Sequence, residues 1–189
     1  MEVGTIVALG SGAVVLAVLL LYNRLVRLRN RVESAHADLE VQLARRHDLI
    51  PNLVDTVKAY ASHEAGVLES VTAARAEAVA ATTTAEEAAA DERVSQALGR
   101  VLAVAEAYPD LKTDERFRAL QDELVATENK LAFSRQLYND TVQSFRDATQ
   151  SVPGVWVARP LGFEAPVFFA AEPAERQAPE WDADARFEE

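Results

Sequence analysis

The feature that most constrains this chain is an uncharged apolar segment near its start. From Val3 to Tyr22 the sequence reads VGTIVALGSGAVVLAVLLLY, with no Asp, Glu, Lys, Arg or His. A helix of this length rises about 30 Å, which matches the hydrocarbon core of a bilayer. Tyr22 ends the segment, at the level where aromatic side chains favour the headgroup region. We therefore predict a membrane-spanning helix from Val3 to Tyr22 and assign residues 1–22 to an anchor.

Charges flank this segment unequally. Glu2 is the only charged residue before it, whereas four arginines follow it before the first acid, Glu33: Arg24, Arg27, Arg29 and Arg31. Because cytoplasmic flanks of membrane helices carry the excess of Arg and Lys, we predict a single-pass cell-membrane protein with its N-terminus outside and the remainder cytoplasmic. A cleaved signal peptide is the alternative, but the segment lacks a preceding basic region and an A-x-A-like cleavage site.

The composition favours helices and excludes several chemistries. Alanine, the best helix former, is abundant, and the 189 residues include only seven Gly and seven Pro. The absence of cysteine excludes disulfides, thiolate catalysis and Cys-ligated metal centres. A formal net charge of −11 argues against a nucleic-acid partner, because such binding requires a basic face.

Apolar residues recur at spacings of three and four along four segments, as expected for helices that bury one face. These stripes run from Leu25 to Leu43, Leu53 to Val71, Val94 to Ala105 and Phe117 to Ala148. The Thr82–Thr84 run is expected to break the second segment, with Thr84 and Glu87 as a capping box, and Pro109 is expected to end the third. We predict an all-α fold, in which the transmembrane helix is followed by an antiparallel up-down four-helix bundle over residues 23–150.

The position of the first turn in this bundle depends on Pro51. One helix from Leu25 to Thr82 would be about 85 Å long, and the later helices would cover it unevenly. A turn near Asp48 to Pro51 gives four helices of comparable length. Proline is also favoured at the first position of a helix, with Asp48 available as a nearby cap. We therefore predict a turn at Pro51, with a kinked continuous helix as the alternative.

Two further segments follow the predicted bundle. Residues 151–171 are apolar and aromatic and contain several Pro and Gly, with Trp156, Phe163, Phe168 and Phe169 as the bulky side chains. We expect them to cap the bundle, because an even number of helices returns the chain to the membrane side; contact with the headgroup zone or with a partner is the alternative. Residues 172–189 are acidic and are predicted to form a disordered tail.

The histidines do not form a recognised catalytic or metal motif. His63 and Glu64 lack the second histidine of the H-E-x-x-H zinc motif. Glu33 and His36 form one Glu-x-x-His pair, whereas a di-iron bundle needs two such pairs. We therefore predict a non-catalytic protein without cofactor or metal. The alternative is a metal-binding or hydrolytic enzyme that uses His36, His47 or His63 with neighbouring acids.

Polar side chains on two of the predicted helices are candidates for a structural network or an interaction surface. One group surrounds the predicted corner in RRHDLIPN, and the other lies in ENKLAFSRQLYND, where Glu128 and Arg135 are two turns apart on one helix face. The candidate residues are Arg45, Arg46, Asp48, Asn52, Glu128, Asn129, Arg135 and Asn139.

The same segments carry a resemblance to a known family. The sequence YNRLVRLRNRVESAHADLEVQLARRHDLIPNLVDTVKAYASHE resembles the opening signature of the LemA family, whose core is V-Q-L-x-R-R-x-D-L-I-P-N-L-V. The segment ENKLAFSRQLYNDTV is similar to the second LemA signature, and SVPGVWVARPLGFEAPVFFAAE to the family's ending. The resemblance runs from Tyr22 to about Glu172. Trp156, the adjacent Arg-Pro segment and the acidic tail depart from the family pattern.

The resemblance implies a single-pass membrane protein with a cytoplasmic helical bundle and supplies no settled catalytic activity. Relatives among magnetosome membrane proteins suggest a role in membrane organisation. We therefore predict a membrane-anchored scaffold or protein-interaction module with an unknown protein partner. Ala8 and Gly12 form a small-xxx-small pair that would let two anchors pack, so a homo-oligomer is left open.

Overall fold

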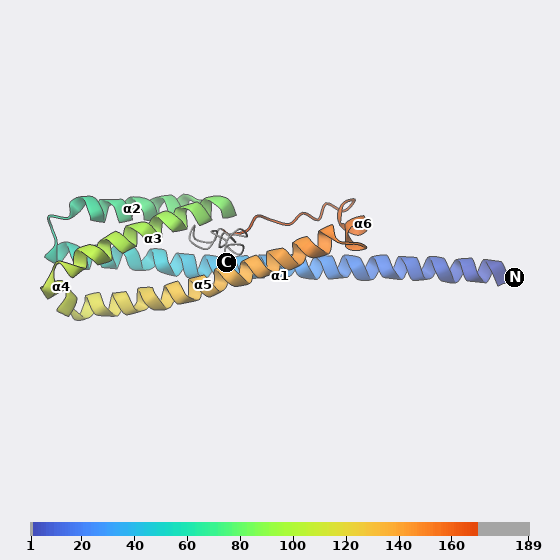
Figure 1. The fold of residues 1–189 in the computed structure, drawn as a ribbon, viewed down its shortest axis with the longest axis horizontal. Coiled ribbons are helices and arrows are strands. Elements are labelled where there is room, and N and C mark those ends of the chain that lie inside the picture. Colours follow the sequence, from blue (N-terminus) through green and yellow to red (C-terminus); the bar gives the residue numbers. More distant parts are fainter. Residues whose placement is uncertain (1, 170–189) are drawn as a thin grey trace, which may run out of the picture.

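A computed structural model of the chain describes residues 2–169, which form six helices and no strand (Figure 1). The predicted acidic tail, residues 172–189, lies outside the described residues. The helices are α1 (Glu2–Tyr60), α2 (Ala65–Ala80), α3 (Thr84–Glu106), α4 (Pro109–Thr113), α5 (Glu115–Gln150) and α6 (Gly154–Ala158).

The second half of α1 forms an up-down bundle with α2, α3 and α5 (Figure 1). Within the bundle α1 packs mainly against α5, and α2 packs mainly against α3. The short helix α4 closes the end far from the N-terminus. The prediction of an all-α fold with one apolar N-terminal helix followed by a helical bundle is therefore confirmed.

The predicted turn at Pro51 is wrong, because α1 continues through Pro51 and ends at Tyr60. The chain turns at residues 61–64 instead, and α2 has 16 residues against 59 in α1, so the helices are not of comparable length. The apolar face of α1 continues past the proline: Ile50, Leu53 and Val57 are all buried. Burial of this face stabilises the helical continuation more than a cap at Asp48 would stabilise a new helix start.

A side chain from α2 compensates for the hydrogen bond that Pro51 cannot make. Proline has no amide hydrogen, so the carbonyl oxygen of His47, four residues earlier, loses its partner within the helix. The Nε atom of Arg75 donates a hydrogen bond to this oxygen at 2.7 Å. The carbonyl group freed by the proline thus becomes a contact between α1 and α2, and the helix does not end there.

Side-chain caps fix the starts of α3 and α5. The capping box of α3 joins Thr83 and Glu86, one residue earlier than the predicted pair Thr84 and Glu87. At the start of α5 the carboxylate of Asp114 accepts a hydrogen bond from the amide of Phe117. The predicted break at Thr82–Thr84 is confirmed, because α2 ends at Ala80 and α3 begins at Thr84.

The buried apolar residues divide into two clusters. The distal core joins α1 beyond Leu49 with α2, α3, α4 and the first turns of α5, and it is almost entirely aliphatic. The anchor-side core joins α1 between Leu25 and Leu43 with α5 beyond Leu131, and it contains Tyr138, Phe145 and Phe169. Residues 151–169, which we call the strap, lie over this second core and contain α6.

The N-terminal part of α1 projects beyond the bundle (Figure 1). Each side chain that the structure describes between Gly4 and Leu20 is exposed, and burial begins with Leu21 and Leu25. This segment is long and apolar enough to cross a membrane. Its exposed apolar surface is expected of a helix whose surroundings are lipid.

Candidate functional site

A belt of charged side chains lies between the two cores. Arg46 of α1 donates hydrogen bonds to the carboxylate of Asp91 at 2.8 Å and to the hydroxyl of Ser95 at 2.8 Å, both on α3. Arg135 of α5 also donates to Asp91. Glu128 lies 3.3 Å from Arg46 and 3.6 Å from Arg135. We call Arg46, Asp91, Glu128 and Arg135 the charge belt; it joins α1, α3 and α5.

The belt is electrically neutral and mostly buried. Two guanidinium groups face two carboxylates, and Arg46 and Asp91 are each only 3% exposed. Burial raises the pKa of the Asp91 carboxyl, against the opposing effect of Arg135 and Arg46. The attraction between the charges of the belt therefore offsets the cost of removing them from water. Because the charges balance, removing one member alone leaves a buried charge without its full set of partners.

The belt contains three of the residues singled out in the sequence and one that was not. Arg46, Glu128 and Arg135 come together, whereas their shared partner Asp91 was missed. Asp91 lies in the acidic, alanine-rich start of α3, where nothing local separates it from Glu86, Glu87 and Glu92. Its place on the same face as Val94 and Leu98 is the only signal that would have indicated burial.

The other predicted polar residues lie elsewhere. Arg45 makes an exposed ion pair with Glu123 at 2.9 Å. Asp48, Asn52 and Asn129 are exposed at the surface. Asn139 holds the strap: its side-chain amide donates to the carbonyl oxygen of Phe169 at 3.0 Å and accepts from the amide of Phe169 at 2.9 Å.

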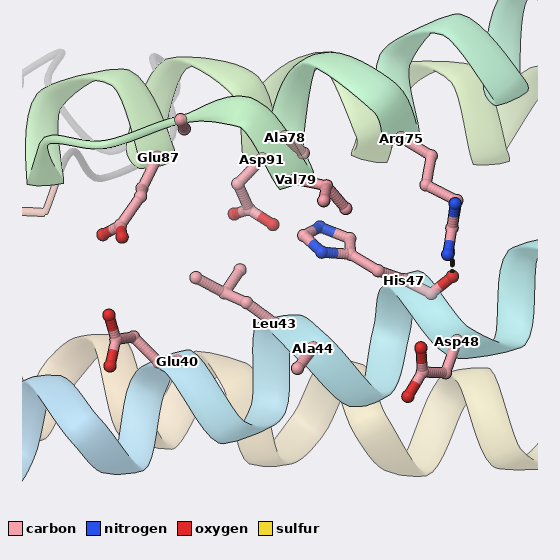
Figure 2. Close-up of a pocket in the computed structure, with 11 residues that line it drawn as sticks. Glu40, Leu43, Ala44, His47, Asp48, Arg75, Ala78, Val79, Glu87 and Asp91 are labelled. Atoms are coloured by element: carbon pink, nitrogen blue, oxygen red, sulfur yellow. Dashed lines mark hydrogen bonds between the residues drawn. The ribbon is translucent and has the colours of Figure 1, made fainter.

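A hollow of about 380 Å³ opens beside the belt, between α1 and the α2–α3 pair (Figure 2). The imidazole of His47 points into it, towards Ala78 and Val79, and its buried Nε2 atom has no hydrogen-bond partner among the described residues. Burial, followed by the charges of Arg46 and Arg75, lowers the pKa of His47, and Asp48 opposes this. The surroundings of His47 therefore favour the neutral form of the imidazole.

A second histidine lies where acids from two helices converge. The Nε2 atom of His36 is 3.0 Å from Glu87 of α3, and its Nδ1 atom is 3.6 Å from Glu40, one turn along α1. One ligand atom from each residue can be chosen so that all three lie within 4.8 Å of one another. Glu33 instead pairs with Arg29 at 3.0 Å, so the Glu-x-x-His spacing does not form a site. His63 is exposed in the turn after α1.

The fold and these sites define a helical-bundle protein with one long apolar N-terminal helix that could span a membrane. The LemA family model matches residues 35–182, which is more than half of the chain. The chain therefore belongs to the LemA family.

Curated relatives agree with this assignment. The chain is 23% identical to magnetosome protein MamQ of Magnetospirillum gryphiswaldense over 188 residues, covering 86% of this chain and 69% of the relative. It is 24% identical to magnetosome proteins MamQ 1 and MamQ 2 of Paramagnetospirillum magneticum, with the same coverage.

Proposed function

We propose that this chain is a non-catalytic scaffold that α1 holds at the cytoplasmic face of the membrane, where its bundle binds a protein partner. The observation that carries the proposal is the internal neutralisation of the charge belt. The most deeply buried charged side chains of the bundle bond to one another and hold α1, α3 and α5 together. Groups engaged in this way are poor candidates for catalysis and good ones for keeping a surface rigid.

The surface best suited to a partner lies at the distal end of the bundle. A groove of about 480 Å³ runs between α1 and α2 and is lined by apolar and small side chains, with one cation and one anion at its edge. Its lining includes Val54, Lys58, Leu68, Glu69 and Ala73. Half-exposed apolar grooves with polar rims are typical of sites that receive a helix from another protein. Asp48 and Asn52 are exposed on α1, just before the α1 residues that line this groove.

The magnetosome association of the curated relatives supports a role in membrane organisation. The orientation rests on the arginines that follow the apolar segment of α1.

In-cell photo-crosslinking tests the scaffold proposal. A photoreactive residue placed at Asp48, Asn52 or Thr72 in the full-length chain should trap one defined protein partner. The same residue at Gln96, which is exposed on α3, is the matched control. Identical background from all four positions would contradict a partner-binding surface at this end of the bundle.

Cysteine labelling tests the orientation, because the chain has no native cysteine. A maleimide that cannot cross membranes should label Glu2→Cys in intact cells and label Glu92→Cys only after the membrane is permeabilised. The reverse pattern would place the bundle outside the cell.

A second candidate function is divalent-cation binding at His36, Glu40 and Glu87. One imidazole nitrogen and two carboxylates make a mixed ligand set that suits Zn²⁺ or another transition-metal ion. Protein purified without chelators should then hold one ion per chain, and His36→Gln should lose it while His63→Gln, in an exposed turn, keeps it. Metal-free wild-type protein that also fails to bind added Zn²⁺ would exclude this function.

A further inference from the structure

The strap exposes an apolar surface that the bundle does not cover. Its outward side chains include a tryptophan that is 70% exposed, and four other large apolar residues along the strap are exposed as well. They are Val152, Trp156, Leu161, Val167 and Phe168. Within the strap the only charged residues are Arg159 and Glu164. Val152, Trp156 and Leu161 lie in or beside α6, and large apolar side chains exposed together in this way mark a contact with another apolar phase or molecule.

The α6 end of the strap lies level with the end of the apolar segment of α1, whereas its other end runs back along the bundle to Tyr138 and Asn139 (Figure 1). The ring of Phe163 meets the ring of Tyr22 edge-on, with centroids 5.8 Å apart. Leu21 packs against the anchor-side core, to which Val157 and Ala158 of α6 belong. Figure 1 shows α6 beside α1 at the point beyond which α1 continues alone. The depth of a bilayer around α1 therefore also fixes the depth of the strap.

The exposure of these side chains is built into the fold. The hydroxyl of Tyr138 donates to the carbonyl oxygen of Val167 at 3.0 Å, and Asn139 holds the backbone of Phe169 from both sides. At the other end, a Cβ atom on Gly154 would collide with the carbonyl oxygen of Ala148. Both ends of the strap thus pack closely on α5, and Trp156 lies exposed between them.

Cationic side chains surround the same level of α1. Arg24, Arg27 and Arg31 line a hollow of about 430 Å³ together with Leu28 and Ser144. All three arginines are exposed. Guanidinium groups just beyond an apolar helix segment, together with an exposed tryptophan at its end, suit the phosphates and the acyl-chain boundary of a phospholipid surface.

We propose that the strap is a second membrane contact, which places Val152, Trp156 and Leu161 at the boundary between headgroups and acyl chains. In this arrangement Arg24, Arg27 and Arg31 face lipid phosphates. The bundle is then held by α1 and by a site beside it, which restricts its tilt relative to the bilayer. The inference needs only that α1 crosses a membrane, and it holds whichever side the bundle occupies and whatever partner it binds.

Tryptophan fluorescence tests the inference directly, because the chain has two tryptophans and one of them can be removed. Full-length Trp181→Phe protein, with Trp156 as its only tryptophan, is placed in bilayers whose acyl chains carry bromine near the headgroups. Emission from Trp156 should shift to shorter wavelength and be strongly quenched by the bromine. A larger fraction of the Trp156 emission should be quenched in bilayers that contain anionic lipid than in purely zwitterionic bilayers.

A matched control moves the tryptophan along the bundle. The triple variant W156F/W181F/F133W carries its tryptophan on α5 at a position where the native side chain is 67% exposed, so it should emit like a solvated indole without quenching. The inference would be overturned if Trp156 emitted at the same long wavelength as the control tryptophan and was not quenched by bromine. A blue shift without bromine quenching would also overturn it, because protein would then cover the strap. An equal extent of quenching in both lipid mixtures would show that the arginines do not take part in the contact.

Discussion

The two cores of the bundle are filled by different kinds of side chain and are enclosed by different elements. In the distal core five helices surround a set of Leu, Ile, Val and Ala side chains, and Phe117 is the one buried aromatic residue in that cluster. In the anchor-side core α1 and α5 do most of the packing, and Tyr138, Phe145 and Phe169 fill the space beneath the strap. Large rings and an irregular strap thus replace two helices where α2 and α3 do not reach.

The charge belt between the two regions should be the most sensitive point. Asp91→Ala removes the buried carboxylate that Arg46 and Arg135 share and leaves Arg46 only the half-exposed Glu128, so we expect a loss of about 3–5 kcal/mol in the free energy of unfolding. Urea denaturation of the full-length protein in detergent, followed by helical circular dichroism, measures this change. Glu123→Ala, which removes only the exposed partner of Arg45, should cost less than about 1 kcal/mol. Equal effects would show that the belt does not link the two regions.

Cavity-forming substitutions separate the two cores. Phe145→Ala should cost about 3–5 kcal/mol and Leu53→Ala about 2–5 kcal/mol, because both side chains are fully buried. Hydrogen exchange should show where each variant loosens. We expect Phe145→Ala to expose the amides of Phe163 and Phe169 in the strap, and Leu53→Ala to expose amides of α2. If both variants loosen the same amides, the cores unfold as one unit and the distinction between them is wrong.

The contact between Arg75 and the His47 carbonyl should depend on Pro51. Arg75→Met should destabilise the protein by about 1–3 kcal/mol, since a buried carbonyl loses its charged donor. In a Pro51→Ala background the alanine amide can bond to the same carbonyl, so the cost of Arg75→Met should shrink. A double-mutant cycle measures this coupling. An unchanged cost in the second background would mean that Arg75 acts through packing or charge alone.

A smaller effect should appear in the pH dependence of stability. The pKa of His47 lies below its ordinary value of 6.5 in the folded protein, because of burial and the nearby charges of Arg46 and Arg75. As the pH falls through 6.5, the unfolded chain binds a proton that the folded chain does not, so stability is lost towards lower pH. Four acids line the same hollow, Glu40, Asp48, Glu87 and Asp91; Asp48 raises the pKa of His47, but burial and the two arginines outweigh it.

Substitution assigns this pH dependence to one residue. His47→Gln should flatten the slope between pH 7 and pH 5, as measured by urea denaturation at each pH. His63→Gln, the same change of residue in an exposed turn, is the matched control. A slope that survives in His47→Gln would have to come from another group.

Periodic features of this fold could be predicted from the sequence, and features that depend on distant partners could not. The stripe of apolar residues on α5 predicts its buried face because each turn repeats the same signal. Pro51 misleads because its local preference favours a helix start, whereas the compensating donor, Arg75, lies in the next helix. Asp91 is hidden among similar acids, and the strap has no period at all, so only the assembled fold shows what these residues contact.

The unbroken course of α1 has a mechanical consequence. Because the helix has no hinge between the apolar segment and the bundle, turning one about its axis turns the other by the same angle. One extra residue inserted after Tyr22 would rotate the bundle by about 100° and raise it by about 1.5 Å. A protein that binds the apolar segment of α1 therefore also sets the rotational orientation of the bundle about the helix axis. A torque applied to one end of α1 is transmitted to the other.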